Sequence, residues 1–359
     1  MSVRTLFVGS GSSYVYRLNI NIEDGSLTLK NKTKVTDNQS NSRPTFVTIH
    51  PNKRILYTIS AIANYDGKKE TGGILTYKID DTTHDLSLID SATSEGNGPC
   101  CILLDNKGEN VLIANYHGGN FGLWKTDQQG SLSKKPTFFQ QDESNVGPHK
   151  SRQDKPHAHQ FIFDPSNKYA YCCDLGQDRI YQFVFDSNQN VLSPNQNALF
   201  TSTQPGAGPR HITFHPTLNV VYGVNELGNT VSTYTLKDDG TLEHSNTLSS
   251  IPEPSDETTA SAVVTSPDGK FLYVSNRGGS ESLAIFKIQD DGSLELVGFE
   301  SSGGKCPRQF MITDDGKLLI VANQNSNDVR VFRRDVRSGK LQALSHIDGL
   351  EQPMCVSML

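Results

Sequence analysis

Short apolar runs alternate with polar turns along the whole chain, and the same order of runs recurs roughly every 50 residues. A full repeat begins with an apolar run led by proline, and a turn connects it to a second run that ends near asparagine. A short polar turn then leads to a third run that contains aromatic residues, and a turn of the form Asp-Gly-x-Leu ends the unit. Short runs that are rich in β-branched and aromatic residues and bounded by turns predict β-strands.

The proline-led run occurs seven times, and one copy has alanine in place of the proline. The copies begin at Pro44, Pro99, Pro156, Pro209, Ala260, Pro307 and Pro353. No segment shows a sustained helical period. Seven repeats of four short antiparallel strands predict an all-β protein, a seven-bladed β-propeller formed by a single domain over residues 1–359.

The chain begins in the middle of a repeat and ends with the piece that is missing there. The C-terminal segment Gln352–Met358 supplies only a first run, while Thr5–Val8, Tyr14–Leu18 and the turn Asp24–Leu27 supply the remainder. We therefore expect the C-terminal strand to complete the N-terminal blade. This pairing closes the ring and removes the free sheet edges that favour aggregation.

The propeller fold predicts which residues meet at one mouth of the central channel. The first strand of each blade lines the channel and the second strand pairs antiparallel beside it, so the start of the first and the end of the second lie together. The residues after the prolines are Thr45, Cys100, His157, Arg210, Arg308 and Met354. The second runs end at Asn115-Tyr116, Asp174-Leu175, Asn225-Glu226, Asn276-Arg277 and Asn323-Gln324.

Several arginines around one histidine and one glutamate suit an anionic substrate, because guanidinium groups bind carboxylates or phosphates. They also suit acid–base chemistry, because histidine and glutamate side chains transfer protons. We expect catalysis from His157, Arg210, Glu226 and Arg277. We expect substrate contacts from His159, Arg308, Gln324, Asn323, Tyr116, Asn115 and Arg152. No metal or other cofactor is expected, because a mouth lined by arginine repels cations.

The sequence also gives expectations for His159, His211 and the loop that carries Arg152. His159 should point to the same side as His157, two positions earlier, where it either supports that histidine or is a core residue. His211 should face away from Arg210 and be structural. The polar loop Gln141–Lys155, which carries Arg152, is either a rim or lid of the mouth or passive surface.

Composition restricts the function further. The 359 residues are 35% hydrophobic and 20% charged, with a net charge of -6, which is typical of a globular protein and argues against nucleic acid as the main partner. No apolar stretch reaches the roughly 20 residues of a membrane helix. The first residues lack the pattern of a signal peptide, and the six cysteines show no disulfide spacing, so a cytoplasmic protein with reduced, buried thiols is expected.

A set of short motifs distributed over nearly the whole chain resembles the seven-bladed lactonase family. This family includes bacterial propeller-type 6-phosphogluconolactonases and fungal carboxy-cis,cis-muconate lactonizing enzymes. The motifs are Ala114–Tyr116 with Gly119–Trp124, Pro156–His159, Gly208–His211, Asn225–Leu227, Ser275–Gly278, and Pro307–Phe310 with Ala322–Gln324. The resemblance implies active-site roles for His157, Arg210, Glu226 and Arg277. With one tryptophan and no Gly-His and Trp-Asp pairs, the chain is a poor match to WD40 propellers.

The resemblance implies hydrolysis of a sugar-acid lactone, with 6-phosphogluconolactone as the leading substrate. A lactonizing cyclase of aromatic catabolism is the alternative, because it also needs arginines for an anionic carboxylate and one proton donor. A non-enzymatic scaffold is the third possibility, although protein-binding rims favour aromatic anchors over a narrow charged mouth. Two departures from the repeat, Asp174 in place of asparagine and Ala260 in place of proline, bear on substrate identity more than on fold.

Overall fold

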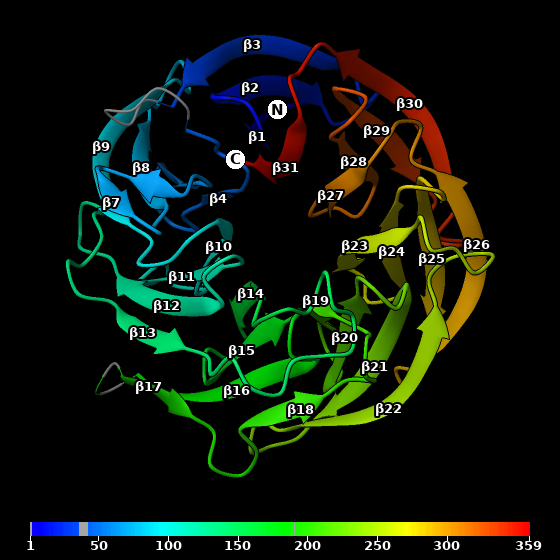
Figure 1. Ribbon diagram of the computed structural model, residues 1–359. Coiled ribbons are helices and arrows are strands. Elements are labelled where there is room, and N and C mark those ends of the chain that lie inside the picture. Colours follow the sequence, from blue (N-terminus) through cyan, green and yellow to red (C-terminus); the bar gives the residue numbers. More distant parts are fainter. Residues whose placement is uncertain (1, 36–41, 188, 190) are drawn as a thin grey trace.

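The computed structural model describes residues 2–35, 42–187, 189 and 191–359, and these residues form β-strands and turns without a helix. Seven antiparallel sheets are arranged in a ring around a central opening, as Figure 1 shows. The predicted all-β, seven-bladed propeller is therefore confirmed. Within these described residues there is no helix long and apolar enough to cross a membrane.

Each sheet has four main strands, counted here from the inner strand outwards. The blade that contains both termini consists of β31 (Pro353–Met358), β1 (Val3–Ser10), β2 (Tyr14–Asn21) and β3 (Leu27–Lys34). The next two blades consist of β4 (Val47–Ile49), β5 (Ile55–Ser60), β8 (Gly73–Ile79) and β9 (Leu86–Thr93), and of β10 (Pro99–Leu104), β11 (Asn110–Asn115), β12 (Asn120–Lys125) and β13 (Thr137–Gln140). A hairpin of β6 (Asn64–Tyr65) and β7 (Lys68–Lys69) projects between β5 and β8.

The remaining four blades repeat this order. The fourth blade consists of β14 (Ala158–Phe163), β15 (Tyr169–Asp174), β16 (Arg179–Asp186) and β17 (Val191–Pro194), with β18 (Phe200–Ser202) also paired to β16. The fifth and sixth blades consist of β19 (Pro209–Phe214), β20 (Val220–Asn225), β21 (Thr230–Leu236) and β22 (Leu242–Ser249), and of β23 (Thr259–Thr265), β24 (Phe271–Arg277), β25 (Ser282–Ile288) and β26 (Leu294–Ser301). The seventh consists of β27 (Pro307–Ile312), β28 (Leu318–Asn323), β29 (Asp328–Arg334) and β30 (Leu341–Asp348).

The two ends of the chain pair to close the ring. Strand β31 is antiparallel to β1, with Leu6 opposite Met358 and Ser10 opposite Pro353. Figure 1 shows the N- and C-termini in the same blade. The predicted completion of the N-terminal blade by the C-terminal strand is therefore confirmed.

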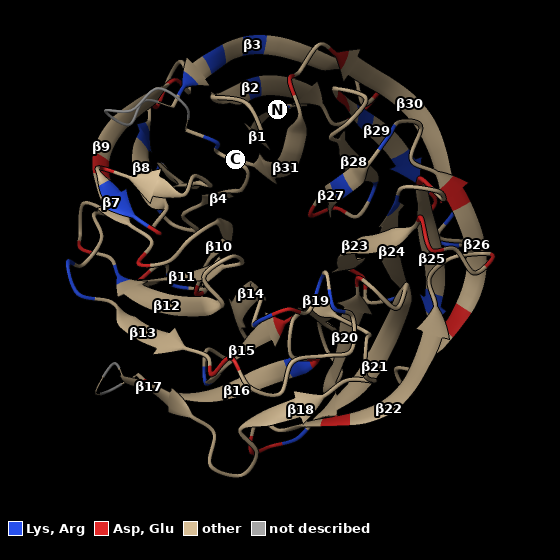
Figure 2. Ribbon diagram, in the orientation of Figure 1, with Lys and Arg blue, Asp and Glu red and all other residues tan. Residues whose placement is uncertain are grey.

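Apolar side chains fill the spaces between neighbouring blades, and charged residues gather on outer strands such as β3 and β26 and on loops (Figure 2). A recurring tyrosine joins adjacent blades through the turn of the form Asp-Gly-x-Leu. The buried hydroxyl of Tyr171 donates to the carbonyl of Gly240, and that of Tyr222 donates to Gly292, each at 2.8 Å. A buried tyrosine hydroxyl needs such a partner, and the glycines adopt φ values of 80° and 83° that favour this residue type.

The inner strands β10, β14, β19 and β27 each carry a β-bulge near the channel mouth. In β10, Pro99 pairs with Asn115 and Cys101 with Ala114, so Cys100 is the extra residue. The same register shift makes His159 of β14, Arg210 of β19 and Arg308 of β27 the extra residues of their strands. A β-bulge interrupts strict alternation and re-aims the side chain of the extra residue. These four side chains are therefore presented at equivalent positions around the channel.

Candidate active site

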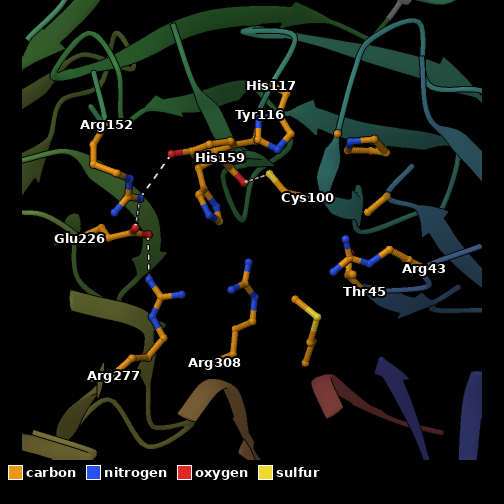
Figure 3. Close-up of a pocket in the computed structure, with 14 residues that line it drawn as sticks. Arg43, Thr45, Cys100, Tyr116, His117, Arg152, His159, Glu226, Arg277 and Arg308 are labelled. Carbon is orange, nitrogen blue, oxygen red and sulfur yellow. Dashed lines mark hydrogen bonds and ion pairs between the residues drawn. The ribbon is translucent and has the colours of Figure 1, made fainter. Parts of the chain in front are cut away.

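One end of the channel opens into a cavity of about 350 Å³, which lies in the usual size range of small-molecule sites. Its wall is formed mainly by the inner ends of the blades (Figure 3). The charged and polar residues of the wall are Arg43, Thr45, Cys100, Tyr116, His117, Arg152, His159, Glu226, Arg277 and Arg308. Four arginines thus accompany a single carboxylate, in a protein whose net charge is negative.

The carboxylate of Glu226 organises one side of the cavity. Its Oε2 accepts a hydrogen bond from Nε of Arg210 at 2.9 Å and lies 3.0 Å from a terminal nitrogen of Arg277. Its Oε1 is bonded to Arg152. Burial alone would raise the pKa of Glu226, but the positive charges of Arg277, Arg210 and Arg152 outweigh burial and lower it to about 2. Glu226 is therefore a permanent carboxylate at neutral pH, with both oxygens engaged by guanidinium groups.

Arg210 contacts Glu226 but does not itself line the main cavity. Its side chain is buried, and a terminal nitrogen also donates to the carbonyl of Ser261 at 2.6 Å. Burial and the nearby charge of Arg277 lower the pKa of Arg210 to about 9, so the guanidinium stays charged at neutral pH. It lines a much smaller space of about 20 Å³ beneath the main cavity, together with His211.

The prediction that His211 faces away from Arg210 is wrong. The two side chains lie together, with a terminal nitrogen of Arg210 at 3.3 Å from Nε2 of His211. The bulge at Arg210 explains the error, because the alternation of side chains fails across the extra residue.

The imidazole on the cavity wall belongs to His159. Its Nδ1 is buried and has no hydrogen-bond partner, and its ring stands edge-on to Tyr116 with centroids 5.6 Å apart. Burial and the charges of Arg210, Arg308 and Arg277 lower the pKa of His159 well below its ordinary value. At neutral pH this imidazole is therefore uncharged.

His157 does not line the cavity, in contrast to the predicted convergence of the residues that follow the prolines. It precedes β14 and stacks on Tyr116, with ring centroids 4.3 Å apart. Its Nδ1 lies 2.9 Å from the carbonyl oxygen of Tyr116, and its Nε2 lies 3.0 Å from the carboxylate of Asp154. Both ring nitrogens are thus occupied behind Tyr116, and His157 supports that residue from outside the cavity.

A shift in the repeat at this blade explains the exchange of the two histidines. Pro99, Pro209 and Pro307 each pair with the asparagine at the end of the second strand, but in this blade Ala158 pairs with Asp174. Pro156 is therefore two positions before the residue that matches the other prolines. The expectation that both histidines point to one side is wrong for the same reason, because His157 lies outside the strand and His159 is its bulged residue.

The loop that precedes β14 carries Arg152 to the cavity wall. There the guanidinium group of Arg152 forms an ion pair with Glu226 and lies 3.4 Å from the hydroxyl of Tyr116. The loop is fixed to the blade below it. The side chain of Gln153 donates to the carbonyl of Leu175 at 2.9 Å and to Asp178 at 2.8 Å. The loop is therefore a part of the rim that is held in place and positions a charged side chain.

Three residues that were predicted to contact the substrate do not line the cavity, and each forms a hydrogen bond within the protein instead. The amide of Asn115 donates to the carbonyl of Ser94, and that of Asn323 donates to Asp328, both at 2.9 Å. Gln324 accepts a hydrogen bond from Arg308 at 3.4 Å. The two asparagines connect the ends of their strands to neighbouring turns, which explains why asparagine recurs at this position.

Sequence reasoning did not find Arg43 or His117, which also line the cavity. His117 follows the predicted Tyr116 by one residue. Arg43 precedes Pro44, whereas the residues predicted at the mouth either follow a proline or end a second run. An arginine directly before a proline-led run was a signal in the sequence, but the repeat alone gives no reason to place it at the mouth.

Comparisons with known proteins identify the family. The family model described as Lactonase, 7-bladed beta-propeller matches residues 5–358.

The chain belongs to the seven-bladed β-propeller lactonase family.

Two relatives and one solved structure show how far the similarity to lactonases extends. The chain is 35% identical over 344 residues to a 6-phosphogluconolactonase of Formosa agariphila, covering 94% of this chain and 95% of the relative. It is 32% identical over 356 residues to a 6-phosphogluconolactonase of Bacillus subtilis, covering 98% and 96%. A periplasmic gluconolactonase of Pseudomonas aeruginosa has a similar structure, with a TM-score of 0.87, 26% identity and coverage of 100% and 99%. The resemblance found in the motifs is confirmed.

The cavity of this lactonase-family protein combines a neutral imidazole with charged guanidinium groups. It lacks an evident nucleophile, because burial raises the pKa of the Cys100 thiol to about 12 and keeps it protonated. Such a site is suited to activating a water molecule and to stabilising negative charge.

Proposed function

We propose that the protein hydrolyses the lactone of a sugar acid, with 6-phosphogluconolactone as the leading substrate. Membership of the lactonase family and the two 6-phosphogluconolactonase relatives support the reaction. The observation that carries the proposal is that the neutral imidazole of His159 lines the same cavity as Arg277 and Arg308. We also propose that the enzyme acts in carbohydrate metabolism in the cytosol. The six free cysteines support this compartment, because the cytosol keeps thiols reduced.

In the proposed mechanism, His159 is the general base. Its neutral imidazole takes a proton from a water molecule as the water oxygen attacks the lactone carbonyl carbon. Arg277, which has nitrogens that Glu226 does not engage, donates to the oxyanion that forms on the carbonyl oxygen. The ring carbon–oxygen bond then breaks, and the proton held by His159 passes to the leaving alkoxide. The product is the open-chain acid, and His159 returns to its neutral form.

The remaining residues hold this arrangement in place. Arg210 and Arg152 fix Glu226, and Glu226 in turn orients Arg277. His157 stacks behind Tyr116 and fixes the side of the cavity that borders His159. Glu226 is not assigned as a base, because both of its oxygens are paired and its pKa lies near 2.

The test is a hydrolysis assay on freshly made 6-phosphogluconolactone with the spontaneous opening subtracted. Arg277→Gln should lower kcat by roughly 100-fold or more, because it removes a donor to the oxyanion. Arg337→Gln, at an exposed arginine outside the cavity, is the matched control. If the folded wild-type protein shows no turnover above background, hydrolysis of this lactone is excluded. The lactonizing cyclase reaction would then be tested with carboxymuconate.

A further inference from the structure

The arginines of the cavity fall into two groups. Arg152, Arg210 and Arg277 are all paired with Glu226. Arg43 and Arg308 form no ion pair with a carboxylate anywhere in the described parts of the chain. One side of the site is therefore largely compensated in charge, and the other side carries two arginines without an ion pair among the described residues.

Arg308 projects into the cavity from the bulge of β27, beside Arg277 (Figure 3). One terminal nitrogen donates to Gln324 at 3.4 Å, which is a long bond to a neutral oxygen. Within the described residues, its other terminal nitrogen and its Nε make no hydrogen bond. Most of the donor capacity of Arg308 is therefore available to a ligand.

Arg43 reaches the cavity from the opposite side to Glu226, as Figure 3 shows. Its carbonyl oxygen accepts a hydrogen bond from the backbone of Ala61 at 2.9 Å, which fixes the segment beside the end of β5. Its Nε donates to the carbonyl of Gly11 at 3.2 Å. That bond fixes the direction of the side chain, and among the described residues neither terminal nitrogen has a partner, so both can make a second, forked contact.

The chemistry of this side matches a phosphate monoester. Neither guanidinium group has a carboxylate partner among the described residues, and a dianion bound between them would balance both positive charges. A phosphate monoester offers three acceptor oxygens, which two arginine forks can share, whereas a single fork suffices for a carboxylate. Thr45, on the same wall, supplies a hydroxyl. Glu226, the only carboxylate among the described residues that line this cavity, lies across from Arg43, and its charge is compensated by three arginines.

We propose that Arg43 and Arg308 form a phosphate clamp that selects phosphorylated sugar lactones over unphosphorylated ones. The inference rests on the proposed function: the lactone ring reacts between His159 and Arg277, while the phosphate at the far end of the sugar lies between Arg43 and Arg308. The clamp makes Arg43 a determinant of specificity in a position that the repeat does not mark.

The test compares two ligands that differ only in the phosphate group, 6-phosphogluconate and gluconate. Their dissociation constants are measured by calorimetry with the wild-type protein, Arg43→Gln, Arg308→Gln and the control Arg337→Gln. Loss of a charge-assisted fork should weaken binding of 6-phosphogluconate by roughly 10- to 100-fold in either clamp variant. The affinity for gluconate should change by less than about threefold. Arg308→Lys keeps the charge without the fork and should give an intermediate loss.

Three results would overturn the clamp. They are a wild-type protein with no preference for the phosphorylated ligand, clamp variants that bind both ligands equally less well, and clamp variants that bind 6-phosphogluconate as the wild type does. Near-UV circular dichroism of each variant establishes that the comparison concerns folded protein. Failure of the hydrolysis proposal is distinguishable. In that case 6-phosphogluconate binding depends on Arg43 and Arg308, yet 6-phosphogluconolactone is not turned over.

Discussion

At the scale of single residues, pairing decides which groups can transfer protons. Glu226 and His157 have the side chains that usually act as acid or base, but all four of their side-chain oxygens and nitrogens face fixed partners. His159 has a buried Nδ1 without a partner and lies beside three charged arginines. The partners of a residue therefore assign its role better than its type does, and the sequence does not list those partners.

Asp174 gives a stability prediction at this scale. It is fully buried, and one oxygen accepts from the backbone of His157 at 2.9 Å while the other has no partner. Burial raises the pKa of Asp174 from 3.8 to about 6. The native state thus holds this proton more tightly than the unfolded state. As the pH rises from about 4 to about 6, the buried carboxylate therefore becomes increasingly destabilising. The full cost applies above about pH 6.

Asp174→Asn should therefore stabilise the protein at high pH. Asparagine occupies the same strand end in β11, β20 and β28, and it cannot ionise. We expect urea unfolding at pH 8 to show a gain on the order of 2 kcal/mol, which disappears at pH 4, where Asp174 is protonated in the native state. A gain of equal size at both pH values, or a loss at pH 8, would contradict this assignment of the pKa.

At the scale of elements, apolar periodicity was sufficient to predict the strands but not the bulges. The runs that begin at Pro99, Pro209 and Pro307 coincide with the first residues of β10, β19 and β27. A bulge adds one residue without changing the apolar pattern, so alternation misplaced the side chain of His211. The shifted repeat of β14 likewise misplaced His157, whereas His159 lines the cavity as predicted. Arg210 and Arg308 follow the prolines that begin first strands, and Glu226 and Arg277 stand at the ends of second strands. These positions were predicted to meet, and the structure does bring the four residues together.

The loop before β14 is an element whose effect can be measured. Gln153 is buried and holds the loop through hydrogen bonds with Leu175, Asp178 and the backbone of His149. Gln153→Ala should release Arg152 from Glu226, lower kcat/KM by about tenfold and destabilise the protein by roughly 1–3 kcal/mol. Steady-state kinetics and thermal unfolding measure both effects. Gln128→Ala, at an exposed glutamine, is the control. Destabilisation with unchanged kcat/KM would show that the loop does not serve the site.

At the scale of the molecule, ring closure holds the cavity together. Strand β31 pairs with β1. Its buried Val356 packs in an apolar cluster with Leu6 of the first blade and Leu318 of the last blade. The backbone of Val356 also donates to the side chain of Gln309 at 2.9 Å, which ties β31 to β27. The same strand presents Met354 at the cavity wall, so closure and site formation depend on one segment.

Deletion of residues 352–359 should lower the melting temperature by more than about 10 °C, because it opens a sheet edge and exposes an apolar cluster. Differential scanning calorimetry measures the shift. Addition of the synthetic peptide of the same sequence should restore part of it by pairing with β1. A deletion variant that melts like the full chain would contradict closure by β31.

The bulge of β14 turns His159 into the cavity and leaves His157 behind Tyr116, and the rate of lactone hydrolysis should follow that placement. The decisive measurement is kcat of His159→Gln and His157→Gln on fresh 6-phosphogluconolactone at neutral pH, with the spontaneous reaction subtracted. We expect His159→Gln to lose roughly 100-fold or more, since it removes the general base, and His157→Gln to lose less than about tenfold. A loss that is larger for His157→Gln than for His159→Gln would contradict this assignment of the catalytic site.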